Sequence, residues 1–142
     1  MRFFLPLLLM CAASVAQANP AHLEAVNTIR AEHGKPALNY DRRLYRAARA
    51  HNSDMIKKGF FSHTGSNGSS VGSRVTDQGF KWCYVSENIA KGQTSLTQVM
   101  QSWMNSPGHR KNILSDQAQA FGLQYNPKDG NNSWVMVLAK AC

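Results

Sequence analysis

Residues 103–114 read WMNSPGHRKNIL, a stretch in which an amphipathic helix meets a proline–glycine pair. The segment that leads into it, residues 94–105, carries apolar side chains three and four residues apart, at Leu96, Val99, Met100 and Trp103. This spacing predicts a helix with one buried face, and the pair at 107–108 is expected to stop it. The turn would aim His109 away from the helix axis. The alternative is that His109 caps the helix end.

Three more helices are predicted upstream of this stretch. Residues 21–33 carry an apolar face and meet Gly34, and a short helix over 70–78 is ended by Gly79. The helix over 42–58 ends at Gly59 and presents one apolar face, made of Leu44, Ala48, His51 and Met55. Residues 39–41 are expected to form the entry to that helix, and the Gly- and Ser-containing residues 64–70 a loop.

Strands are predicted on either side of the opening stretch. Residues 80–90 are rich in aromatic and β-branched side chains, as strands are. Residues 118–125 and 133–139 are two short apolar runs joined by turn residues, which is typical of a β-hairpin with a longer loop. Helices early in the chain and strands late in it predict an α+β domain, with helices stacked on a small antiparallel sheet.

Size and charge exclude several classes of protein. The chain has 142 residues, which predicts one domain and is too short for a TIM barrel. Its apolar fraction of 43% is that of a globular protein rather than a disordered chain. The formal charge of +8 and the isoelectric point near 9.8 favour anionic partners, without choosing among nucleic acid, acidic glycan and lipid headgroups.

The first 18 residues have the pattern of a secretory signal peptide. A positive start at Arg2 is followed by an apolar run over 3–13 and a small-x-small cleavage site at 16–18. A lipoprotein anchored at Cys11 is the alternative. The apolar run is shorter than the roughly 20 residues that span a bilayer. We therefore expect residues 19–142 to be a secreted or periplasmic domain with no transmembrane segment.

Two cysteines would remain after cleavage, Cys83 and Cys142. An even number of cysteines in a secreted chain indicates a disulfide. It would close a loop of roughly 60 residues, and chain entropy puts its contribution to stability at about 4 kcal/mol. The alternative is two free thiols in a reducing host.

Two more side chains are candidates for chemistry. Glu87 lies between apolar runs, where a carboxylate is costly to bury without a partner. The alternative is an exposed residue on an alternating strand. His63 opens the loop over 64–70 directly after the apolar pair at 60–61, a position that can face a cleft. The alternative is a loop histidine bonded to the backbone.

Together with His109, these residues offer two imidazoles and one carboxylate. That set suits zinc or another divalent metal held by His63, Glu87 and His109. The three are distant in sequence, and no His-Glu-x-x-His or Cys-x-x-Cys motif supports them. Residues 68–72 match the G-x-S-x-G nucleophile elbow, but that motif needs a buried strand before it, and a polar loop precedes it here. We reject the elbow.

Several segments, taken in order, resemble the CAP superfamily (cysteine-rich secretory proteins, antigen 5 and pathogenesis-related 1), specifically its bacterial SCP-domain branch. The segments are FFSH at 60–63, SENIA at 86–90, WMNSPGHRKNIL at 103–114, FGL at 121–123 and the strand that contains Trp134. The similarity runs over residues 21–138. It implies a three-layer α-β-α sandwich with a small antiparallel sheet between the helices, and a solvent-open cleft.

The resemblance also implies a site. Family members line the cleft with two histidines and two acidic residues, and some bind a divalent metal there. His63, Glu87 and His109 match three of the four. The fourth, a glutamate on the helix before the second histidine, falls near Ser106 and is absent. Ser86 stands where the family often has glycine.

These features predict a secreted CAP/SCP-domain protein that acts by binding rather than as an enzyme. Its cleft would hold a divalent metal, and its basic surface would engage an anionic envelope, a lipid, sterol or glycan, or a protein. The lipid and sterol partners are implied by the resemblance alone. The alternative is a metal-assisted, protease-like hydrolase with Glu87 as the candidate catalytic residue. We expect a monomer and no nucleic-acid partner, because the basic residues are spread along the chain.

Overall fold

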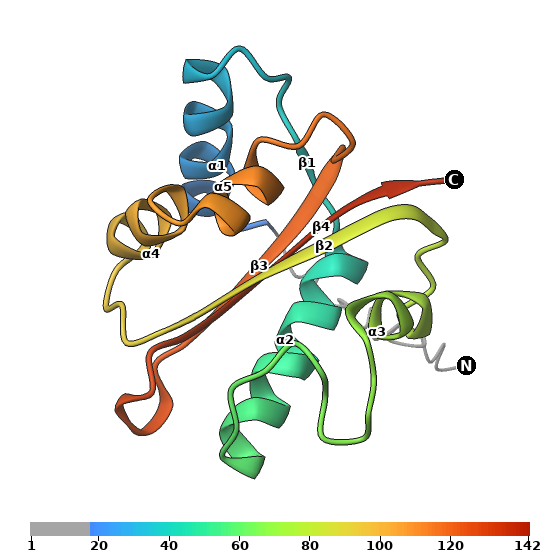
Figure 1. Ribbon diagram of the computed structural model, residues 1–142, viewed down its shortest axis with the longest axis vertical. Coiled ribbons are helices and arrows are strands. Elements are labelled where there is room, and N and C mark those ends of the chain that lie inside the picture. Colours follow the sequence, from blue (N-terminus) through green and yellow to red (C-terminus); the bar gives the residue numbers. More distant parts are fainter. Residues whose placement is uncertain (1–17) are drawn as a thin grey trace, which may run out of the picture.

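Four strands form one sheet in the order β1-β3-β4-β2 (Figure 1). The structure is a computed structural model, and it describes residues 18–142. β2 (Trp82–Lys91) and β3 (Ala120–Asn126) both pair antiparallel with β4 (Ser133–Ala141). β1 (Asn39–Tyr40) adds a short parallel edge to β3. The predicted α+β sandwich is confirmed, with a sheet that is mixed rather than wholly antiparallel.

The central strand β4 is buried on both faces. Its side chains alternate between two apolar clusters, because successive residues of a strand point to opposite faces of the sheet. The even-numbered residues of β4 join one cluster and the odd-numbered residues join the other: Trp134, Met136 and Leu138 against Val135, Val137 and Ala139. The continuous apolar run in the sequence therefore marks the centre of the sheet.

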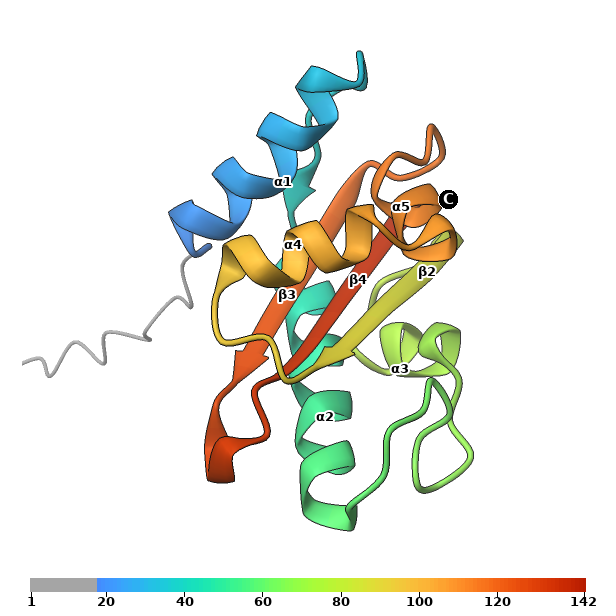
Figure 2. The same cartoon turned by 60° about the vertical axis from the view of Figure 1, so that its left-hand side comes forward.

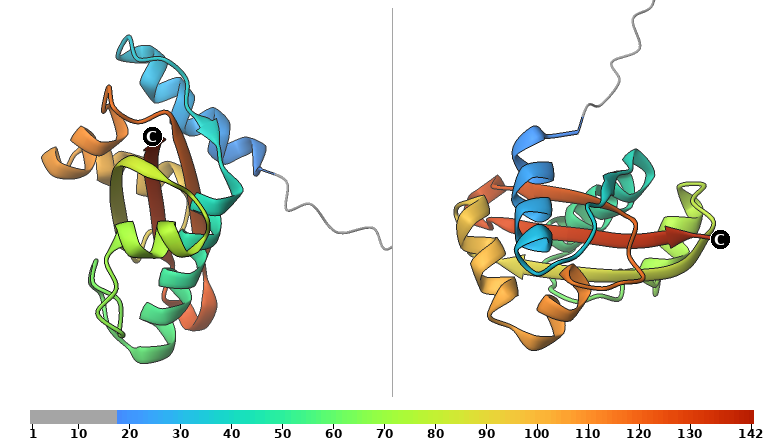
Figure 3. Two further views of the ribbon diagram at one scale, coloured as in Figure 1. Left: turned by 90° about the vertical axis from the view of Figure 1, so that its right-hand side faces the viewer. Right: turned by 90° about the horizontal axis from the view of Figure 1, so that it is seen from above.

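Each face of the sheet is covered by helices (Figures 2 and 3). α1 (Pro20–Glu32), α4 (Leu96–Met104) and α5 (Pro107–Ile113) contribute to the first cluster. α2 (Arg42–Lys58) and α3 (Val71–Asp77) contribute to the second, on the opposite face. This is the three-layer arrangement that the sequence predicts.

The helices begin where polar side chains cap them. Four residues accept a hydrogen bond from the backbone of the first helical turn: Asn19, Asp41, Ser70 and Ser95. Such caps satisfy amide groups that have no partner within the helix. Gly59 ends α2 in the left-handed conformation at φ +69°, which glycine adopts without strain.

Two local expectations are wrong. Pro107 and Gly108 do not only stop α4. They begin α5, with the proline at the first helical position, where its missing N–H is no loss. His109 thus lies in the first turn of a helix rather than beyond one. Residues 39–40 pair with β3 as a strand, although Asp41 does cap the helix that follows.

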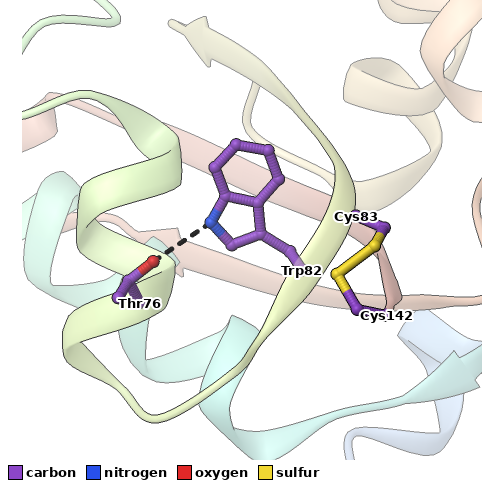
Figure 4. The surroundings of a disulfide bond; sticks show 4 residues. All are labelled: Thr76, Trp82, Cys83 and Cys142. Atoms are coloured by element: carbon purple, nitrogen blue, oxygen red, sulfur yellow. Dashed lines mark hydrogen bonds between the residues drawn. A yellow bond between two sulfur atoms is a disulfide. The ribbon is translucent and has the colours of Figure 1, made fainter.

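The predicted disulfide between Cys83 and Cys142 is present (Figure 4). The pairing of β2 with β4 changes register between Trp82 and Tyr84, so Cys83 is the extra residue of a bulge. A bulge re-aims side chains, and here the two cysteine Cα atoms lie 4.7 Å apart. The bond fastens the end of the chain to the start of β2.

Membrane spans and the leader are separate questions. Over residues 18–142, none of the helices combines the length and the apolar character that crossing a membrane requires. The predicted signal peptide lies, apart from Ala18, outside the described residues.

We expect Gly122→Ala to lower the free energy of unfolding by about 3 kcal/mol, the upper part of the usual range for overpacking. Gly122 lies on β3, where α2 packs most closely on the sheet. A methyl group built there would meet the backbone of Leu44 and Tyr45, which cannot move aside as a flexible side chain would. Urea unfolding followed by circular dichroism measures the change.

Gly108→Ala is the matched control, since a methyl group at Gly108 meets no atom within 4 Å. Alanine is also favoured over glycine inside a helix by roughly 0.5–1 kcal/mol. Gly108→Ala should leave stability unchanged or raise it. Equal losses in the two variants would contradict the close approach of α2 to β3.

Candidate functional site

The carboxylate of Glu87 is the centre of a buried polar cluster. Glu87 lies in the middle of β2, opposite Val137 of β4, and its side chain is only 2% exposed. Arg74 donates a hydrogen bond from Nη2 to Oε2 at 2.8 Å, and His63 donates from Nδ1 to Oε1 at 2.8 Å. Both carboxylate oxygens are therefore engaged by the protein, which is how a charge is tolerated under the surface.

Arg74 connects this carboxylate to the loop before α3. Besides Glu87, its guanidinium donates to the backbone oxygens of His63 at 3.0 Å and Ser69 at 2.9 Å. The side chain is 8% exposed. Arg74 thus fixes both ends of the loop that carries His63, and this holds the imidazole against Glu87.

Sequence analysis missed Arg74, although a signal was available. Arg74 follows Val71 by three residues and precedes Val75, so it shares the apolar face of α3. An arginine on an apolar face needs a buried anionic partner. Glu87, a carboxylate set between apolar runs, was the complementary signal.

His63 reaches the surface from this cluster. Its side chain is 58% exposed, and the hydrogen bond to Glu87 uses Nδ1. That hydrogen bond raises the pKa of His63 above its ordinary value, against the opposing effects of burial and of the Arg74 charge. His63 therefore takes up a proton more readily than a free histidine.

His109 lies beside the same cluster on α5. Its Nδ1 is 3.0 Å from the hydroxyl of Ser106, the residue at which the family's fourth acidic side chain was expected. Burial lowers the pKa of His109, and the positive charge that His63 can carry lowers it further. The two imidazoles are thus close enough to interact, and their pKa values move in opposite directions.

Two asparagines hold α5 against β2. Asn88, next to Glu87, donates to the backbone oxygen of His109 at 3.0 Å. Asn112 donates to the side-chain oxygen of Asn88 at 2.8 Å and to the backbone oxygen of Glu87 at 3.4 Å. These contacts set the place of His109, and local sequence patterns gave no sign of them.

His51 is the fourth side chain near the carboxylate. It is buried on α2, donates from Nε2 to the backbone oxygen of Ser62 at 2.8 Å, and lies 3.9 Å from Glu87 Oε1. Burial lowers its pKa. His51 also lines, with Arg74, Asp54 and Ser66, a pocket of about 210 Å³. The structure therefore shows that this histidine reaches the cluster from behind.

Only part of the predicted metal set suits a metal. His63 and His109 each use Nδ1 within the protein, which is how imidazoles are oriented when Nε2 binds zinc. Glu87 does not fit as a third ligand, because Arg74 and His63 occupy its two oxygens. Within residues 18–142, no group of three or more His, Cys, Asp or Glu side chains is placed to hold a metal ion.

The α-β-α sandwich and its His–Glu cluster define the class to which the chain is related. The model of the cysteine-rich secretory protein family, CAP, matches residues 23–138. The chain belongs to this family, as its sequence motifs predict.

Two curated relatives come from Bacillus subtilis. The uncharacterized protein YkwD is 35% identical over 113 residues, which cover 80% of this chain and 44% of that protein. The uncharacterized membrane protein YlbC is 29% identical over 106 residues, covering 75% of this chain and 31% of that protein. The chain thus spans less than half the length of the curated relatives it matches.

Solved structures show the same fold. An extracellular protein with an SCP domain from Bacillus anthracis has a TM-score of 0.79 and 27% identity, and the match covers 85% of this chain and 39% of that one. An outer surface protein from Borrelia burgdorferi has a TM-score of 0.78 and 20% identity, covering 87% and 92%. The second likeness concerns the fold alone.

Proposed function

We propose that the chain is a secreted CAP-domain protein of binding type. Its ligand site is the cluster of His63, Glu87 and His109, and its basic surface engages anionic envelope, lipid or protein partners. The observation that carries the proposal is the engagement of both Glu87 oxygens, by Arg74 and by His63. A carboxylate held in this way orients an imidazole and has no free oxygen to act as a base.

Three observations support secretion. The sequence begins with the pattern of a signal peptide. Cys83 and Cys142 form a disulfide, which persists in oxidising compartments. The relative from Bacillus anthracis is described as extracellular and that from Borrelia burgdorferi as an outer surface protein. Cleavage near Ala18 would release the domain over residues 19–142.

The two histidines are the part of the cluster that would hold a divalent metal. His63 and His109 would supply the ligand nitrogens, and Glu87 would orient His63 from behind. A bound ion would supply a positive charge that polarises an oxygen of the ligand. Arg74 places a permanent positive charge against Glu87, so we propose a weak site rather than a structural one.

We expect calorimetric titration with zinc to show one ion per chain. His63→Ala and His109→Ala should each abolish binding, because each removes one of the two ligands. Glu87→Gln should weaken binding by about tenfold, as loss of a carboxylate behind a metal-binding histidine does. Circular dichroism must first show that each variant is folded.

His33→Ala is the matched control for the titration. His33 is exposed at the end of α1 and bonds the backbone oxygen of Ile29. Its loss should leave zinc binding unchanged. Absence of binding in the unaltered protein would remove the metal from the proposal, and the cluster would then be tested with organic ligands.

A second candidate function is a hydrolase, favoured by one observation. The Glu87–His63 hydrogen bond is the arrangement in which a carboxylate orients a histidine for proton transfer. Turnover of a peptide or ester by the purified protein, lost in Glu87→Gln but kept in His33→Ala, would place this function ahead of binding. Among the described residues no paired amide donors converge on the cluster to stabilise an oxyanion, so binding is the first proposal.

A further inference from the structure

One end of the molecule combines exposed apolar and basic side chains. The C-terminal end of α2 and the connection between β3 and β4 lie together at the lower end of Figures 1 and 2. A shallow pocket of about 190 Å³ joins them, because it is lined by residues from the end of α2 and from the strands beside it, including Ile56, Phe61, Lys91 and Asn131.

Phe61 provides the apolar part of this end. Its side chain is 51% exposed, and it follows Phe60, which is half-buried against the second core cluster. Ile56, also half-buried, lines the pocket beside it. Phe60 thus anchors the segment to the core, while Phe61 presents its ring to solvent.

The second large apolar side chain that is exposed among residues 18–142 is used differently. Trp82 donates from its indole nitrogen to the backbone oxygen of Gly72 and to the hydroxyl of Thr76. Its ring lies so close to Gly72 that a methyl group there would collide with it. Trp82 therefore holds α3 to β2 (Figure 4), whereas the described structure gives Phe61 no comparable role.

Lysines surround Phe61. Lys57 and Lys58 end α2, Lys91 lines the pocket beside Phe61, and Lys128 lies in the β3–β4 connection; all four are exposed. Two acidic residues are nearby. Asp54 is bonded to the backbone and hydroxyl of Ser66, and Asp129 is exposed in the same connection as Lys128. The balance at this end is positive.

We propose that this end of the molecule docks on a bilayer that contains anionic phospholipid. Phe61 would insert at the level of the headgroups, where an aromatic side chain beside lysines is favoured. Lys57, Lys58 and Lys91 would contact the phosphates. The inference rests on the proposed function, because it identifies one of the anionic partners of the basic surface. A soluble polyanion would use the lysines and leave Phe61 in water, so the exposed ring favours a bilayer.

Sedimentation with vesicles tests the docking. We expect the purified protein to pellet with vesicles of 70% phosphatidylcholine and 30% phosphatidylglycerol (about a third anionic lipid, as in strongly anionic membranes) and not with phosphatidylcholine alone. Phe61→Ser should lower the partition coefficient by about tenfold, the effect of losing a half-exposed aromatic side chain from the interface. Lys57→Gln with Lys58→Gln should lower it by about thirtyfold, roughly fivefold for each lysine.

A charge-matched control lies on the same helix. Arg46 and Arg49 are exposed on α2, nearer its start, so Arg46→Gln with Arg49→Gln removes two charges without touching this end. That variant should bind vesicles within about twofold of the unaltered protein, since charges far from the surface are screened. Equal losses in the two double variants would mean attraction by net charge, and would overturn docking through this end.

Two further outcomes decide the proposal. Phe61→Ser that binds anionic vesicles as tightly as the unaltered protein, and is displaced by free polyphosphate, would show a site for polyanions rather than bilayers. His63→Ala should keep vesicle binding and lose zinc. Loss of vesicle docking with zinc binding retained would therefore refute only this inference, and the reverse would refute only the metal part of the proposed function.

Discussion

Arg74→Met should lower the free energy of unfolding by about 3–5 kcal/mol, the usual effect of removing one partner of a buried ion pair. The substitution keeps most of the side-chain volume and removes the charge. It leaves the Glu87 carboxylate, 2% exposed, with His63 as its remaining hydrogen-bond partner. It also frees the backbone oxygens of His63 and Ser69. Urea unfolding followed by circular dichroism measures the loss.

A double-mutant cycle separates the ion pair from the loss of packing. Glu87→Gln alone leaves Arg74 buried without an anionic partner, and should also be strongly destabilising. Arg74→Met together with Glu87→Gln should be less destabilised than the sum of the two single variants, because the residues are in direct contact. Additive losses, or a loss below about 1 kcal/mol in Arg74→Met, would contradict the importance of the pair.

The same variant has a signature at the functional site. Arg74 lowers the pKa of His63, while the hydrogen bond from Glu87 raises it. If the histidine stays in place when Arg74 is lost, its pKa should rise further, as NMR titration of the imidazole would show. A fall in that pKa would mean that the loop has released His63 from Glu87, and that Arg74 chiefly positions the histidine.

Loss of the Cys83–Cys142 disulfide should lower the free energy of unfolding by about 4 kcal/mol, since the bond closes a long loop in the unfolded chain. The two cysteines are separated by 59 residues in sequence. The double variant Cys83→Ser with Cys142→Ser should therefore unfold at a markedly lower urea concentration. The adjacent strands β2 and β4 keep their pairing, so the fold itself should survive.

Cys11→Ser is the control for this measurement, because it removes a cysteine that takes no part in the bond. Its stability should match that of the unaltered protein. Reductant should destabilise both of these proteins and leave the double serine variant unchanged. An equal response of all three proteins to reductant would contradict a stabilising role for the disulfide.

Much of the fold was predictable because its signals are local. The helix over 42–58 follows from apolar spacing and a terminal glycine, and its predicted bounds are those of α2. The hairpin of β3 and β4 follows from two apolar runs joined by turn residues. β1 was missed because two residues paired with a distant strand leave no periodic pattern. α5 was missed because proline both stops one helix and begins another.

The candidate site divides along the same line. The sequence by itself determined the residue types, the family and the disulfide, and it identified His63, Glu87 and His109 as the residues of interest. Only the tertiary structure decided their partners. Arg74 meets Glu87 because α3 packs against β2, and His51 reaches it from α2 on the same face of the sheet. A buried charge is stabilised by whichever groups the packed elements bring within hydrogen-bonding distance, and spacing along the chain does not specify that choice.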